Sequence, residues 1–500
     1  MVLSFLRHPK IQRLYGIDVR AMAAMRITLG LLLLVNLVQR APYLAAHYSD
    51  VGAMPRAALD SMSIHALSGS PVFVGFLFLV AAAFAVMLIL GYRTWMATVV
   101  SWVLLVSLHQ RNLLINNSGD HLLTLLLFWS LFLPLGARAS VDARAGRTRV
   151  PRMVASFGSL ALLLQMVWVY LFSALFKTHP IWREEGTAIY YALQLDRYTT
   201  VFGGWLADLD VVHEPLTHAT LYLEMYGPFF AFIPIGFVFF RPLTAFAFIG
   251  FHIGLALCFD LIYFSYVCSI GWLAFLPAEF WDRLLRWKPL RRIGEIWDAL
   301  IGRVYRAIDS VARAAPKLPV WSLEYKPWVL RDVLAGLALI YVFFINVGTV
   351  YPNMGMPGYL SWIGRDLNLH QEWSMFAPYP SREDGWWVVP AKLVNGSEVD
   401  LFNGRSSIDW DRPVNLADTF TTPRWRKYLE NVLKAKYRAH IPHYAAWLRH
   451  DWNRRHDEAR QVESMELYFM LEYTKPDHQP PIESRKMVYR WNVSGGDYSR

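Results

Sequence analysis

The stretch PVFVGFLFLVAAAFAVMLIL, residues 71–90, is twenty residues long and contains no charged side chain. A helix of about 20 residues crosses the hydrocarbon core of a bilayer, which is about 30 Å thick. The composition of the chain agrees, because 55% of its 500 residues are hydrophobic, 15% are aromatic and only 18% are charged. That is too apolar for an ordinary soluble domain of this length. The sequence therefore predicts an integral membrane protein.

Further apolar stretches on both sides of residues 71–90 predict an all-α polytopic membrane domain with about nine transmembrane helices. The third and fourth stretches are short. The seventh and eighth are almost continuous around Asp260, where a bent or re-entrant pair would fit. The expected spans are 20–38, 71–90, 94–109, 121–136, 154–176, 218–240, 243–259, 261–277 and 333–351.

Basic residues gather in the loops on one side of these spans. They occur at the start of the chain, at Arg93, in 138–152 and in 278–332. The positive-inside rule then places the N-terminus in the cytoplasm and, after nine crossings, the C-terminus outside the cell inner (plasma) membrane. The net charge of +10 follows this loop pattern and forms no nucleic-acid-reading motif. We therefore expect the lipid bilayer, and no nucleic acid, as a partner.

Residues 293–315 predict an amphipathic helix in the cytoplasmic loop 278–332. Its arginines, Arg303, Arg306 and Arg313, lie off the apolar face, as in a helix that rests on the membrane surface. Packing against other cytoplasmic loops is the alternative. The apolar face would hold Ile293, Ile296, Trp297, Leu300, Ile301, Val304, Ile308 and Val311.

The composition changes after about residue 352, which predicts a membrane domain over 1–352 and a C-terminal α+β extracytoplasmic domain over 353–500. Asn395-Gly396 stands between two strand-like segments and is a strong hairpin signal. Residues 465–474 and 484–493 also have strand composition, whereas 423–460 has that of helices.

Ionisable side chains within or beside the spans are candidate functional residues, because charge is costly in hydrocarbon. Lys177 ends the fifth apolar run, in YLFSALFKTHPIW (170–182), five residues before Trp182. A desolvated lysine has a lowered pKa and serves as a base near neutral pH. The alternative is a lysine that extends from a helix end to the membrane surface. The other candidates are Arg26, Asp120, His121, Glu224, His252 and Asp260.

Asp120 and His121 open the fourth span, in INNSGDHLLTLLLFW (115–129). Asp120 could cap the helix or take part in chemistry, whereas His121 could donate a hydrogen bond to a ligand or act as a proton relay. His252 lies within a span, where a structural role is the alternative to ligand binding. Glu224 is expected to pair with a buried cation, Arg26 or Lys177.

No metal site is expected, because His121, His179 and His252 have no tight ligand spacing. The two cysteines, Cys258 and Cys268, lie in one apolar stretch and are expected to pack as small hydrophobic residues. The chain also contains no nucleotide-binding glycine loop and no nucleophile elbow.

Several segments, taken in order, resemble the membrane domain of the vitamin K-dependent γ-carboxylases and their bacterial homologues, often called the horizontally transferred transmembrane (HTTM) domain. The resemblance covers roughly residues 15–400. It rests on DVRAMAAMRITLGLLLLVNLVQRAPYLAAHYSDVGAMPR (18–56), LHQRNLLINNSGDHLL (108–123), YLFSALFKTHPIW (170–182), FHIGLALCFDLIYFSYV (251–267) and QEWSMFAPYPSREDGWWVV (371–389).

The resemblance implies a membrane enzyme that uses vitamin K hydroquinone or menaquinol, with O2 and CO2 as co-substrates and no metal. Lys177 would be the catalytic base and His121 would support it. In such an enzyme the deprotonated quinol reacts with O2, a γ-proton leaves a glutamyl side chain, CO2 is captured and the quinol epoxide is released. The residues expected to bind the cofactor are His252, Trp182, Asp120, Arg26, Glu224 and Tyr266.

Beyond about residue 400 the chain matches neither the propeptide-binding nor the glutamate-binding elements of the animal enzymes. The resemblance therefore does not establish carboxylation of a peptide or protein at the outer face. The alternative function is a non-catalytic membrane protein, either a transporter or an assembly or docking protein.

Overall fold

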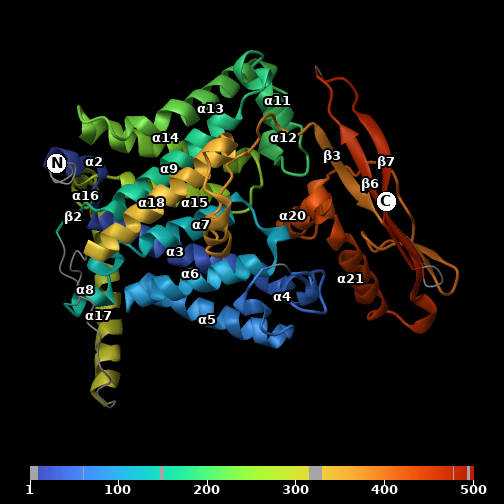
Figure 1. Ribbon diagram of the computed structural model, residues 1–500, viewed down its shortest axis with the longest axis horizontal. Helices are drawn as coiled ribbons and strands as arrows, with labels where there is room; N and C mark the ends of the chain where they lie inside the picture. Colours follow the sequence, from blue (N-terminus) through green and yellow to red (C-terminus); the bar gives the residue numbers. More distant parts are fainter. Residues whose placement is uncertain are drawn as a thin grey trace.

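The computed structural model describes residues 9–59, 61–146, 151–314, 329–476, 478–492 and 496–499. Figure 1 shows a bundle of helices lying side by side, with a β-sheet and the helices α20 (Pro423–Val432) and α21 (Ile441–Asn453) against one end of it. We call this second part the sheet domain. Helices α2 (Pro9–Tyr15) and α17 (Lys288–Ala314) lie at the opposite end of the bundle.

The bundle places an inner group of helices inside an outer shell. The inner helices α3, α7 and α9 supply about half of the buried hydrophobic core, and α7 is buried along nearly its whole length. In the shell helices α5, α14 and α18 fewer than a third of the residues are buried, as expected of helices that face lipid. The bundle helices are α3 (Val19–Arg40), α5 (Pro71–Leu90), α6 (Thr94–Arg111), α7 (Ser118–Ser130), α9 (Phe157–Phe176), α13 (Asp210–Phe230), α14 (Phe237–Cys258), α15 (Phe264–Trp272) and α18 (Val329–Val350).

Five helices among the described residues are long and apolar enough to cross a membrane. The chain is therefore a multi-pass membrane protein, but the expected count of nine spans is not confirmed. The other bundle helices are short or carry polar ends; α7 has 13 residues and α15 has nine. The five are α5, α9, α14, α18 and the helix that begins at Val19.

The expected span 218–240 is wrong, because the chain turns within it. Helix α13 begins at Asp210 and ends at Phe230, and α14 begins at Phe237. Gly236, between the two helices, has a φ of 65°, a left-handed conformation that glycine adopts without strain. The apolar run continues through this turn, so hydrophobicity alone did not reveal it.

Local sequence signals explain where the key helices begin. Asn117 and Asp120 form a capping box at the start of α7, in which each side chain accepts from the other residue's backbone N–H. Ser156 and Ser159 do the same for α9. These caps fix the ends of the helices that carry Asp120 and Lys177.

Short elements cover both ends of the bundle. Helix α17 confirms the predicted amphipathic helix. At the end near the N-terminus lie α2 (Pro9–Tyr15), the strands β1 (Ile17–Asp18) and β2 (Met153–Val154), α8 (Val141–Arg144), α16 (Ala278–Leu284) and α17 (Lys288–Ala314). The connections toward the sheet domain contain α4 (Leu44–Tyr48), α10 (Pro180–Arg183), α11 (Ala188–Leu193), α12 (Val201–Ala207) and α19 (Ser361–Asp366).

The sheet domain confirms the predicted α+β composition. Strands β4 and β5 pair antiparallel across Asn395-Gly396, as the hairpin signal predicted. In the sheet the order is β5-β4-β6-β7-β8, with β3 also paired to β6. The elements are β3 (Glu383–Val388), β4 (Pro390–Leu393), β5 (Glu398–Asp400), α20 (Pro423–Val432), α21 (Ile441–Asn453), β6 (Val462–Tyr473), β7 (Ile482–Asn492) and β8 (Gly496–Ser499).

The bundle core continues past residue 352. Leu369 and Trp373 belong to it, and Gln371 accepts a hydrogen bond from Gln165 of α9 at 2.7 Å. Helix α20 packs against residues 113–115 and α21 against the sheet. The sheet domain therefore attaches to the bundle through several buried contacts.

Candidate functional site

Lys177 and Glu224 form a buried ion pair at the end of the bundle that faces the sheet domain. Lys177 is the C-cap residue of α9 and is only 2% exposed. Its Nζ donates to Glu224 Oε2 of α13 and to Ser173 Oγ, one turn back on α9, each at 2.6 Å. Lys177 therefore does not extend to the membrane surface.

Trp182 covers this pair on one side. Lys177 Nζ lies 5.0 Å from the centre of the Trp182 ring, a cation–π distance. The indole is fixed because its Nε1 donates to the Phe376 carbonyl at 2.9 Å. The apolar cluster around the pair contains Ala174, Ile181, Trp182, Ala188, Tyr190, Tyr191 and Leu221, with Met225 and Phe376 packed against it.

Lys177 retains one N–H that no described residue accepts. An ammonium group has three N–H bonds, and residues of the described chain accept two of those of Lys177. The ammonium group can therefore donate to one further acceptor at this site.

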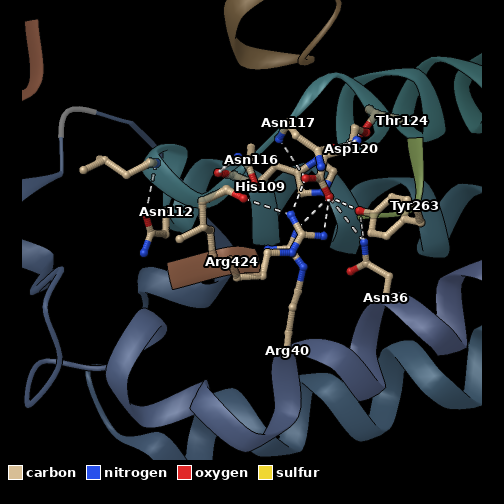
Figure 2. A network of polar contacts seen from close by, with 12 residues as sticks. Asn36, Arg40, His109, Asn112, Asn116, Asn117, Asp120, Thr124, Tyr263 and Arg424 are labelled. Atoms are coloured by element: carbon tan, nitrogen blue, oxygen red, sulfur yellow. Dashed lines mark hydrogen bonds and ion pairs between the residues drawn. The ribbon is translucent and has the colours of Figure 1, made fainter. Parts of the chain in front are cut away.

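Asp120 lies at the centre of a second buried group, which we call the Asp120 cluster (Figure 2). Arg40 Nη2 lies 2.6 Å from Oδ1, and Arg424 contacts both carboxylate oxygens. The hydroxyl of Tyr263 also donates to Oδ1, and His109 Nε2 lies 3.3 Å from it. Asn36 and the backbone N–H of Asn117 complete the set.

The Asp120 cluster joins the two parts of the protein. Arg40, His109 and Tyr263 come from α3, α6 and the start of α15, whereas Arg424 comes from α20 of the sheet domain. Both carboxylate oxygens accept from protein donors, and Asp120 also caps α7. The structure therefore gives Asp120 capping and ion-pairing partners and leaves little room for a ligand at its oxygens.

His121 follows Asp120 but has different surroundings. Its Nδ1 is buried without a hydrogen-bond partner among the described residues. No hydrogen bond or ion pair of the described residues joins it to Lys177.

His252 belongs to a third polar group, inside the bundle. The residue is 1% exposed, and its Nε2 lies 2.7 Å from the Tyr170 hydroxyl. That hydroxyl accepts from Trp272 Nε1 at 2.9 Å. His252 Nδ1 has no partner within the described chain. The tyrosine contact gives His252 a structural partner and leaves one nitrogen free.

Arg26 and Tyr266 lie apart from these groups. Arg26 donates to the carbonyls of Leu88, Ile89 and Ala139 at 2.6–2.7 Å, and so satisfies the last carbonyls of α5 at the end of the bundle away from the sheet. Tyr266 is 59% exposed.

The structure thus brings together three of the sequence candidates, Lys177, Glu224 and Trp182. We did not predict the role of Ser173 from the sequence, although its spacing of four residues from Lys177 places both on one helix face. We also did not predict the roles of Arg40 and Arg424, for which no local signal exists. Within the described ranges, no group of three or more His, Cys, Asp or Glu side chains is placed to hold a metal ion.

A cavity of about 680 Å³ lies elsewhere, between α4 and the helices of the sheet domain. Its walls are rich in aromatic rings, and its rim carries His450, Asp451, Arg454 and Arg455. None of the sequence candidates lines it. Its aromatic residues are Tyr43, Phe402, Phe420, Trp425, Tyr444, Trp447 and Trp452.

Comparison with known proteins gives one match. The model of the HTTM domain family matches residues 15–281, more than half of the chain, and this range includes Asp120, Lys177, Glu224 and His252. No curated protein and no solved structure matches the chain. The chain therefore belongs to the HTTM domain family.

Proposed function

We propose that this protein is a quinol-dependent membrane enzyme of the vitamin K-dependent γ-carboxylase type. The observation that carries the proposal is the buried Lys177, which donates to Glu224 and Ser173, lies beside Trp182, and retains one N–H that no described residue accepts. Such a residue in an apolar site is suited to proton transfer. Membership of the HTTM domain family supports the same reaction class.

The residues around Lys177 fit a quinol. Tyr190, Tyr191 and Trp182 offer aromatic surface, and Lys177 offers the polar contact that a quinol oxygen needs. The 680 Å³ cavity does not include Lys177, so the ring would enter as neighbouring side chains move. When bound, a quinol supplies an acidic phenolic proton and the electrons that reduce O2.

The chain's own residues have separate tasks in this proposal. Lys177, once neutral, accepts the phenolic proton at Nζ. Glu224 stabilises the ammonium that results, and Ser173 orients the amine. Trp182 and Phe376 close one side of the site and exclude water, which strengthens these electrostatic interactions. His121 supports the site from α7 by family resemblance.

We extend the proposal to the rest of the reaction and to its location. O2 and CO2 are co-substrates, and a glutamyl side chain on a peptide or protein is the group carboxylated. The N-terminus lies in the cytoplasm, and the sheet domain lies outside the cell inner (plasma) membrane. The basic loops at the α17 end of the bundle support this orientation.

The test is quinol turnover by the purified protein. Reduced vitamin K or menaquinol is supplied with O2, and the epoxide is followed by chromatography. We expect epoxide from the parent protein and from Lys392→Ala, which removes an exposed lysine paired with Glu463. Lys177→Ala should lower the rate by about 10²–10⁴-fold, the contribution of a positioned base. Folded parent protein that forms no epoxide with either quinol would overturn the proposal.

The second candidate function is docking or assembly without catalysis. The aromatic cavity between α4 and α21 favours it, because a concave aromatic surface with a charged rim is typical of a binding site. On this alternative, Trp447→Ala removes partner binding, and Lys177→Ala leaves it unchanged.

A further inference from the structure

Helix α17 leaves the end of the bundle and runs across the direction of the bundle helices (Figure 1). Two hydrogen bonds hold its middle. Trp297 Nε1 donates to the Ala139 carbonyl at 3.0 Å, and Arg144 donates to the Asp298 carbonyl at 2.8 Å. Ile301 is buried against the same region. The bundle therefore holds the middle of α17 and leaves other parts of the helix uncovered.

One apolar side of α17 remains uncovered. Ile293 and Ile296 are 60% and 62% exposed, and Leu300 and Val311 are exposed beside them. We call these four residues the α17 strip. Their spacing of three, four and eleven residues places them on one helix face. A continuous apolar strip on an otherwise charged helix indicates a surface that binds something apolar.

The other faces of α17 carry an excess of positive charge. Between residues 288 and 311 stand five cations and three acids. Arg291 pairs with Glu295 at 3.1 Å. Arg303 and Arg306 are exposed. The cations are Lys288, Arg291, Arg292, Arg303 and Arg306, and the acids are Glu295, Asp298 and Asp309.

We propose that α17 binds the anionic lipid surface at its end of the bundle. The α17 strip enters the boundary between headgroups and acyl chains, and the cations contact phosphate and other anionic headgroups. The direction of α17 carries the argument, because a helix that crosses the bundle direction lies parallel to the membrane surface. Charge complementarity selects anionic over neutral lipid.

The test measures the depth of two labelled positions in bilayers. In full-length protein with Cys258 and Cys268 replaced by Ala, a fluorophore is attached to Ile296→Cys on the α17 strip or to Glu295→Cys on the polar side. The protein is reconstituted in phosphatidylcholine vesicles with or without phosphatidylglycerol. Brominated lipid and aqueous acrylamide serve as quenchers. Both variants must first elute as one symmetric species in detergent.

The proposal expects lipid quenching at 296 and acrylamide quenching at 295. Equal acrylamide quenching at the two positions would place α17 in water and overturn it. Protection of position 296 from both quenchers would instead show that protein covers the strip, which also overturns it.

A second variant tests the choice of lipid. Arg303→Gln with Arg306→Gln removes two cations and leaves the α17 strip intact. Each basic residue near an anionic surface contributes about 1 kcal/mol to binding. We therefore expect the preference of α17 for vesicles with phosphatidylglycerol over vesicles of phosphatidylcholine alone to fall by about tenfold or more. An unchanged preference would overturn the anionic part of the proposal. Neither experiment measures quinol turnover, so a result that overturns the lipid proposal is distinct from one that overturns the proposed function.

Discussion

The Asp120 cluster and the Lys177–Glu224 pair are both buried near the sheet domain, but they balance charge differently. Asp120 faces two arginines, a histidine and a tyrosine, and its oxygens accept from donors on both parts of the protein. Lys177 faces one carboxylate and one hydroxyl from bundle helices only. Both oxygens of Asp120 accept from protein donors, whereas Lys177 has one N–H that no described residue accepts.

This difference suggests what each group does. A fully paired carboxylate that links distant segments stabilises the fold, because loss of one partner leaves buried charge uncompensated. A buried ammonium group with an N–H that no described residue accepts can donate a hydrogen bond to a ligand. We therefore assign stability to the Asp120 cluster and chemistry to the Lys177–Glu224 pair.

The largest expected effect on stability is that of Asp120→Asn. The substitution leaves Arg40 and Arg424 buried without a counter-charge, and breaking such a pair costs about 3–5 kcal/mol. Thermal unfolding in detergent, followed by tryptophan fluorescence, should show a large fall in Tm. The matched control is Glu463→Gln, which breaks an exposed pair with Lys392 worth about 0–1 kcal/mol. Equal Tm values for the two variants would remove the structural role of the cluster.

A smaller fall in Tm is expected at the Lys177–Glu224 pair, and a second substitution should reverse part of it. Lys177→Met and Glu224→Gln each leave one charged group without its partner, so each should lower Tm. The double variant leaves neither charge and should recover part of the loss, with a coupling of about 0.5–3 kcal/mol. Additive losses in this double-mutant cycle would mean that the two side chains do not interact in solution.

The smallest expected effect depends on pH and concerns Glu430 on α20, which accepts from Tyr198 and from Lys427 at 3.2 Å. Lys427 and Arg197 lower the pKa of Glu430 from 4.5 to about 2, against the opposing effect of burial. Because the folded pKa is the lower one, the stabilisation is present above pH 4.5 and disappears as the pH falls from 4.5 toward 2.

Thermal unfolding from pH 6 to pH 3 measures this effect. The Tm of the parent protein should fall further over this range than that of Glu430→Gln, because glutamine binds no proton at that position. The same loss in both proteins would show that Glu430 does not contribute.

The sequence predicted those features that depend on neighbouring residues. The hairpin at Asn395-Gly396, the strands around 465–474 and 484–493, and the amphipathic helix were all found near the expected positions. Each follows from turn chemistry or from hydrophobic periodicity, which act over a few residues.

The sequence did not predict the features that depend on distant contacts. Asp120 and Arg424 are 304 positions apart, and nothing near Asp120 indicates that an arginine of α20 will reach it. Glu224 was expected to pair with Arg26 or Lys177, and only the fold selected Lys177. The turn before α14 was missed although Pro234 and Gly236 offered a signal, because apolar residues surround them.

The most direct test of the account is quinol turnover by the Lys177→Met, Glu224→Gln double variant, with its Tm measured on the same sample. The variant removes the chemistry of the pair without leaving an unpaired charge in the bundle. We predict a folded protein that forms quinol epoxide about 10²–10⁴-fold more slowly than the parent protein. Epoxide formed by the double variant at the parent rate would contradict the assignment of Lys177 as the base.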